Sequence, residues 1–113
     1  MTYNDKTYNC LHFACDFYER LTGSNPRLLV GELLTDKANR RVNPSALSAF
    51  YPTDTPTDGT WAVMHGAQVH IGIYQDGLIH HLTESGQHAT PPHIAQLQHG
   101  RIIYYELDCN RHQ

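Results

Sequence analysis

Cys10 and the histidines that follow it are the side chains of this chain best suited to chemistry. Cys10 comes directly after Asn9, a residue type that often caps the N-terminus of a helix. A thiol at that position lies near exposed backbone N–H groups and the positive end of the helix dipole, and both favour the thiolate. A nearby histidine could act as its base, with a further polar side chain to orient that base. The alternative is that Cys10 is a small core residue, as buried cysteines often are.

His70 lies in a segment that alternates between apolar and other residues, residues 69–74, as a strand with one buried face does. The next residues, Gln-Asp-Gly at 75–77, fit a three-residue hairpin loop closed by glycine. With that loop, His70 and His80 are diagonal neighbours on one strand face, with their Cα atoms about 7–8 Å apart, and His81 points to the opposite face. A two-residue loop would instead bring His81 onto the face of His70. We predict the three-residue loop and therefore His80 as the partner of His70.

The elements that must position these side chains follow from hydrophobic periodicity. Apolar residues with helical spacing predict a helix over residues 9–23, and shorter helices are expected at 28–34 and from Pro44 toward residue 50. After a loop at 52–59 the period changes to two, which predicts four strands. They cover residues 61–64, 69–74, 78–82 and 101–107. This order predicts an α+β fold with N-terminal helices packed on a C-terminal antiparallel sheet meander, in one domain of residues 1–113.

Composition excludes several classes of function. A formal net charge of −3 with only 8 Lys and Arg provides no broad basic surface, so neither nucleic acid nor a membrane is an expected partner. No apolar run is long enough to span a bilayer or to resemble a signal peptide. We therefore expect synthesis in the cytoplasm, and something else must deliver the protein if it acts outside the cell.

The remaining cysteines and histidines show no pattern of a cofactor site. Cys15, in the helix interior, and Cys109, after the last strand, lack activating neighbours and are expected to be structural. His12 points about 200° around the helix axis from Cys10, away from the face of the nucleophile. The nine histidines show neither Cys-x-x-Cys nor His-Glu-x-x-His spacing, so no metal or other cofactor is expected.

In order and in type, these segments resemble the NlpC-type family of papain-like cell-wall cysteine peptidases. Members of that family carry an aromatic residue before Asp-Cys-Ser-Gly-Phe, then an apolar strand after Gly-Asp, then His-Val-Gly-Ile-Tyr, and then a strand ending in an aliphatic residue and His. The matching segments of this chain are Tyr-Asn-Cys-Leu-His-Phe at 8–13, Asp-Gly-Thr-Trp-Ala-Val-Met at 58–64, His-Ile-Gly-Ile-Tyr at 70–74 and Leu-Ile-His at 78–80.

The resemblance implies a papain-like fold and a cysteine hydrolase that cleaves amide bonds in peptidoglycan stem peptides without a cofactor. By matching position, Cys10 would be the nucleophile, His70 the general base and acid, and His80 the polar residue that orients His70. Tyr8 would assist substrate or oxyanion binding. Small domains of this kind also look like phage tail-associated proteins and secreted antibacterial amidases, which implies a phage tail or an immunity or inhibitor protein as further partners. If the protein acts outside the cell, the same likeness implies delivery by a phage particle or non-classical export.

Two other functions remain open. Asn-Cys-Leu-His-Phe at 9–13 is also similar to the Asn-Cys-Glu-His-Phe block of lecithin:retinol acyltransferase-like proteins, which place the histidine strand before the cysteine helix. The opposite order in this chain favours a hydrolase. An acyl or amide transferase would use the same site with an acceptor that outcompetes water. A non-catalytic wall-binding or phage tail module would keep the fold without turnover.

Overall fold

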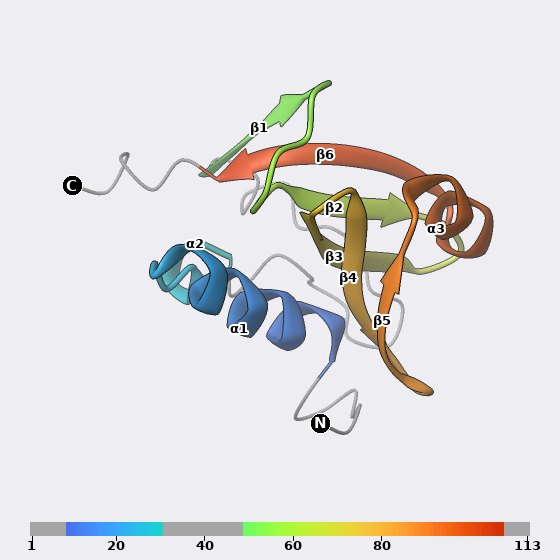
Figure 1. Cartoon of the computed structure of the whole chain (residues 1–113), viewed down its shortest axis with the longest axis horizontal. Helices are drawn as coiled ribbons and strands as arrows, with labels where there is room; N and C mark the ends of the chain where they lie inside the picture. Colours follow the sequence, from blue (N-terminus) through green and yellow to red (C-terminus); the bar gives the residue numbers. More distant parts are fainter. Residues whose placement is uncertain (1–8, 31–48, 108–113) are drawn as a thin grey trace.

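A computed structural model describes residues 9–30 and 49–107 of the chain (Figure 1). The described helices are α1 (Cys10–Thr22), α2 (Arg27–Val30) and α3 (Pro92–His99). The strands are β1 (Phe50–Thr53), β2 (Trp61–His65), β3 (Val69–Gln75), β4 (Leu78–Thr83), β5 (Gly86–Thr90) and β6 (Arg101–Leu107). They form one antiparallel sheet of six strands in the order β1-β6-β2-β3-β4-β5, which confirms the predicted α+β class. The predicted meander is wrong at its last strand, because β6 lies between β1 and β2 rather than following β4.

The N-terminus of α1 is fixed by a reciprocal pair of hydrogen bonds. The Asn9 side chain accepts from the backbone N–H groups of Leu11 and His12 at 3.0 and 3.2 Å, and Nδ1 of His12 accepts from the backbone N–H of Asn9 at 3.2 Å. His12 thereby takes the place that Glu or Gln usually holds in a capping box. The helix ends at Gly23, whose φ of 80° is the left-handed conformation that favours glycine.

The two faces of the sheet carry separate hydrophobic clusters. One face, called here the α1 face, packs against α1. Its strand members are Phe50, Trp61, Val63, Val69, Ile71, Ile73 and Leu107. The other face, called here the α3 face, is smaller. Its members are Ala62, Met64 and Ile79 with Ala95 of α3. In Figure 1 α1 lies below the sheet and α3 lies at its right-hand end.

The hairpin between β3 and β4 has a two-residue loop, so the predicted three-residue loop is wrong. Its loop residues, Asp76 and Gly77, both have positive φ, 54° and 79°. The flanking pairs are Gln75↔Leu78, Tyr74↔Ile79 and Ile73↔His80. Two consecutive positive φ values give a turn whose twist matches the right-handed twist of the strands, and Asp-Gly suits it. The shift of one residue moves His80 off the face of His70 and brings His81 onto it.

Three elements differ from the sequence prediction. β1 occupies residues 50–53, the first two of which fall before the expected loop, and it pairs with β6 at the edge of the sheet. β5 and α3 were not predicted, and α3 begins with proline in its first turn, where a missing N–H costs nothing. The expected helix from Pro44 and most of that at 28–34 lie outside the described residues. None of the described helices is long and apolar enough to cross a membrane.

Candidate functional site

A chain of hydrogen bonds joins two buried histidines and a threonine on the α3 face. Nε2 of His70 lies 2.9 Å from Nδ1 of His81, and Nε2 of His81 lies 2.9 Å from Oγ1 of Thr90. His70 and His81 are only 3% and 1% exposed. If Nε2–H of His81 donates to Thr90, Nδ1 of His81 accepts a hydrogen bond from Nε2–H of His70, and Nδ1 of His70 is then the basic nitrogen. The reverse tautomers require Thr90 to donate instead.

His81 is held neutral by its surroundings. Burial is the main cause that lowers its pKa, to about 4, and repulsion from His99, His88 and His80 lowers it further. Since an isolated histidine titrates near pH 6.5, His81 carries no charge at neutral pH. It can therefore serve as a fixed, neutral hydrogen-bonding group that orients the ring of His70.

Gly72 permits the close approach of β4 that places His81 beside His70. Ladder pairing between β3 and β4 stops at Ile73↔His80. A Cβ atom at Gly72 would lie 2.6 Å from Cγ2 of Ile79, 2.8 Å from the carbonyl oxygen of His80 and 3.2 Å from Cβ of His81. Only a residue without a side chain fits there, which gives the glycine of the His-Ile-Gly-Ile-Tyr segment a steric reason.

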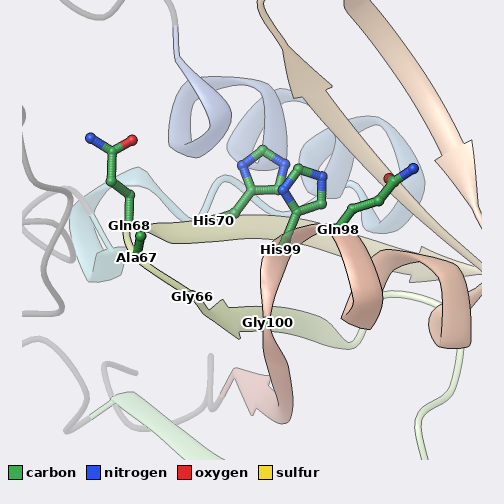
Figure 2. A pocket seen from close by; sticks show the side chains of 7 residues that line it. All are labelled: Gly66, Ala67, Gln68, His70, Gln98, His99 and Gly100. Carbon is green, nitrogen blue, oxygen red and sulfur yellow. The ribbon is translucent and has the colours of Figure 1, made fainter.

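His99, at the end of α3, completes the cluster. Its ring stacks on that of His70, with centroids 4.2 Å apart and an interplanar angle of 23°, and it meets His81 edge-on at 5.2 Å. Figure 2 shows the rings of His70 and His99 close together, with Gln68 to one side and Gln98 to the other.

Two clefts border the cluster. One, of about 440 Å³, is lined by Gly66, Ala67, Gln68, His70, Gln98, His99 and Gly100. The other, of about 360 Å³, is lined by His81, Thr83, Ser85, His88, Thr90, Gln98 and His99.

Cys10 is the first residue of α1, as predicted, and it is fully buried in the cluster on the α1 face. His70 pairs with Met64 in the sheet and therefore faces the α3 side. The predicted nucleophile therefore packs against one face of β3, and the predicted base projects from the opposite face. Cys15 is buried as expected, and burial raises the pKa of its thiol to about 12, so it stays protonated at neutral pH.

The two side chains nevertheless lie at the same level along β3. In Figure 1 α1 runs in the same direction as β3. Phe17 of α1 stacks on His80 with ring centroids 4.6 Å apart, and His80 pairs with Ile73. Cys10 precedes Phe17 by about 10 Å of helix, and His70 precedes Ile73 by about 10 Å of strand. The start of α1 is therefore level with the histidine cluster.

The prediction that His80 orients His70 is wrong. His80 points to the α1 face, where it packs on Phe17. The two-residue loop shifts the register by one residue from the predicted one, so each side chain of β4 lies on the face opposite to the one expected. Tyr8 and Cys109 lie outside the described residues. The sequence prediction also missed Thr90 and His99, since nothing in their spacing from His70 indicates that β5 and α3 return to it.

Comparisons with family models, with curated proteins and with solved structures found no match. Function is therefore inferred from the site itself together with the order of the sequence segments.

Proposed function

We propose that this chain is an NlpC-type cysteine hydrolase that cleaves amide bonds in peptidoglycan stem peptides. Cys10 is the nucleophile, His70 the general base and acid, and His81, in place of the expected His80, orients His70. The observation that supports this proposal most strongly is the buried chain from His70 through His81 to Thr90, with both separations at 2.9 Å. A base fixed by a second polar group is the arrangement that thiol and hydroxyl nucleophiles require.

The hydrogen bond to His81 determines which nitrogen of His70 does the chemistry. Since Nε2 of His70 is engaged with His81, a thiol exchanges its proton with Nδ1. The thiolate of Cys10 attacks the carbonyl carbon of the amide, the C–N bond breaks, and the leaving amine takes the proton from Nδ1. His70 then removes a proton from water, which attacks the thioester and releases a carboxylate and the free thiol.

The position of Cys10 supports its role as the nucleophile. It begins a helix that is capped at Asn9, where the dipole and the terminal N–H groups favour the thiolate. The proposal requires the thiol to reach Nδ1 of His70 at the start of β3. Because the two side chains lie on opposite faces of β3, the thiol would have to pass the edge of the strand. In the described part of the chain, residues 69–71 of β3 pair with β2 and not with β4, and this unpaired edge is where the proposal requires the thiol and imidazole to meet.

The same elements support the papain-like form of the α+β fold. In that form a helix that begins with cysteine packs on an antiparallel sheet, and neighbouring strands of the sheet carry the base and its orienter. Here α1 packs on β3 and β4, and these strands carry His70 and His81. Peptidoglycan as the substrate class follows from the ordered resemblance of residues 8–13, 58–64 and 70–80 to the wall peptidases.

The test is incubation of the full chain with purified peptidoglycan, followed by mass spectrometry of the products. Wild type should release peptide fragments with a new free carboxylate, and Cys10→Ala and His70→Ala should release none. Cys15→Ala is the matched control, because it removes a thiol from the same helix, and it should keep activity. Products joined to an acceptor amine would indicate a transferase instead. Equal release by wild type and a folded Cys10→Ala variant would overturn the proposal.

A further inference from the structure

We propose that His70, His81 and His99 bind a divalent transition-metal ion of the zinc class. Each contributes one ring nitrogen, and these three atoms all lie within 4.8 Å of one another. Two of the residues are buried and His99 is half-buried, so the three nitrogens lie near one another and are largely shielded from bulk water. Imidazole nitrogens of this kind are the preferred ligands of zinc at sites that keep one position open.

The separations suit tetrahedral coordination after a small adjustment. Metal–nitrogen bonds of about 2.0–2.1 Å place the nitrogens of a tetrahedral site about 3.3–3.4 Å apart. In the structure Nε2 of His70 and Nδ1 of His81 are 2.9 Å apart, and no pair in the trio exceeds 4.8 Å. The required spacing lies between these values. Side-chain movements of about 1–1.5 Å bring the nitrogens to this spacing, and the His99 ring must also turn out of its stack on His70 so that its in-plane lone pair points at the ion.

The hydrogen bonds around the trio fit a metal ligand set. A histidine bound to a metal usually donates its other ring N–H to an oxygen acceptor, which fixes the tautomer. Oγ1 of Thr90, 2.9 Å from Nε2 of His81, provides that acceptor and directs the Nδ1 lone pair of His81 toward the cluster. The ion takes the place of the proton between His70 and His81. That proton moves from Nε2 to Nδ1 of His70, so the charge of the two side chains does not change.

The backbone brings His99 to the cluster through two glycines. A Cβ at Gly66 would lie 2.5 Å from the carbonyl oxygen of His99, and a Cβ at Gly100 would lie 2.4 Å from the carbonyl oxygen of His65. The end of α3 therefore sits against the turn between β2 and β3 at a distance that side chains would prevent. The cleft of about 440 Å³ beside His70 and His99 leaves room for water or a ligand at the fourth position (Figure 2).

The ion would inhibit the hydrolase reversibly, which we call the off-switch, and this part of the inference rests on the proposed function. A metal on Nε2 of His70 leaves the proton on Nδ1, the nitrogen that must accept the proton of Cys10. Thiol activation and metal binding therefore exclude each other. A chelator should activate the hydrolase and zinc should inhibit it.

Metal binding is tested independently of activity on the full chain carrying Cys10→Ala, after treatment with a chelator. Titration with Co²⁺, followed by absorption, and with Zn²⁺, followed by calorimetry, should give one ion per chain with a tetrahedral cobalt spectrum and no thiolate-to-cobalt band. His99→Gln should weaken binding by at least about 100-fold, and loss of the acceptor in Thr90→Val should weaken it about 10–100-fold. His93→Gln, an exposed histidine of the same helix, is the matched control and should leave affinity unchanged.

Two results would overturn the metal site. One is equal affinity in the parent and in His99→Gln, with circular dichroism showing that both are folded. The other is a thiolate band, which would place the ion on cysteine. If Co²⁺ binds through the histidines but chelator-treated wild type releases nothing from peptidoglycan, the hydrolase proposal fails and the metal site stands. If the wild type is active and insensitive to zinc and chelator, the off-switch is wrong.

Discussion

Replacing Gly72 by alanine tests the geometry that brings the two histidines together. The φ of Gly72 lies outside the left-handed region, so an alanine there meets no backbone strain of its own. Without a steric conflict, Gly72→Ala would stabilise the protein by about 0.4–1 kcal/mol, because it restricts the unfolded chain. The sign of the effect therefore depends on the space around Cβ.

The structure predicts the opposite sign. The added Cβ would lie 2.8 Å from the carbonyl oxygen of His80, a backbone atom, and 2.6 Å from Cγ2 of Ile79. β4 must move by roughly half an ångström or more to restore van der Waals contact, and overpacking of this kind costs about 1–3 kcal/mol. For a domain of this size, that lowers the thermal midpoint by roughly 4–12 °C. The movement also pushes His81 away from His70, so activity should fall with stability.

Urea unfolding, followed by the fluorescence of Trp61, measures the free energy change. Gly77→Ala is the control, since its φ of 79° strains an alanine but no heavy atom lies within 4 Å of its Cβ. It should lose about 1–2 kcal/mol from backbone strain alone and keep the histidine site intact. A Gly72→Ala variant that is as stable as wild type, or more stable, refutes the close approach of β4.

Three further predictions concern titration, thiol reactivity and register. With metal chelated, His81 should leave the free energy of unfolding unchanged above about pH 7 and lower it by about 3 kcal/mol as pH drops from 6.5 to 4. The reason is that His81 takes up its proton at a higher pH in the unfolded chain than in the folded one. Equal pH slopes for wild type and His81→Asn in urea titrations contradict this. Since burial raises the pKa of Cys15 to about 12, iodoacetamide at pH 8 should label it at least about 100-fold more slowly than free cysteine. Mass spectrometry that finds Cys15 labelled as fast as free cysteine contradicts its burial. His81→Ala should lower kcat/KM on peptidoglycan about 10–100-fold and His80→Ala less than about threefold. A larger loss in His80→Ala than in His81→Ala would contradict the two-residue loop and favour the three-residue one.

Local signals predicted the start of the site well. Asn9 and Gly23 bound α1 because capping and left-handed termination depend on residues within one turn. The alternation around His70 placed it on the face opposite the aliphatic residues of β3, as the strand period requires. The loop was harder, because Asp76-Gly77 fits a two-residue turn as well as the end of a three-residue one, and strand twist decides between them.

Long-range contacts limited the rest. His99 reaches His70 only because Gly66 and Gly100 allow α3 to close against the turn between β2 and β3, and a lone glycine in a sequence does not reveal its distant neighbour. The face of β3 on which Cys10 packs is likewise decided by the core that α1 buries rather than by the residues beside the thiol. Metal-ligand spacing gave no signal, since three separate elements supply the three histidines.

The most direct test of the proposed hydrolase is the rate at which Cys10 reacts with iodoacetamide as a function of pH, in wild type and in His70→Ala, with chelator present. Because Cys10 is buried, access also limits its absolute rate, and the diagnostic quantity is the change of the rate with pH. An activated dyad predicts a rate that falls less than about tenfold from pH 9 to pH 6, whereas the rate of free cysteine, with a thiol pKa of about 8.5, falls more than about 100-fold. His70→Ala should lose this shallow pH dependence while Cys15→Ala keeps it. If the rate of Cys10 falls with pH as steeply as that of free cysteine and His70→Ala leaves the profile unchanged, the thiol is a packing residue and the proposed hydrolase is wrong.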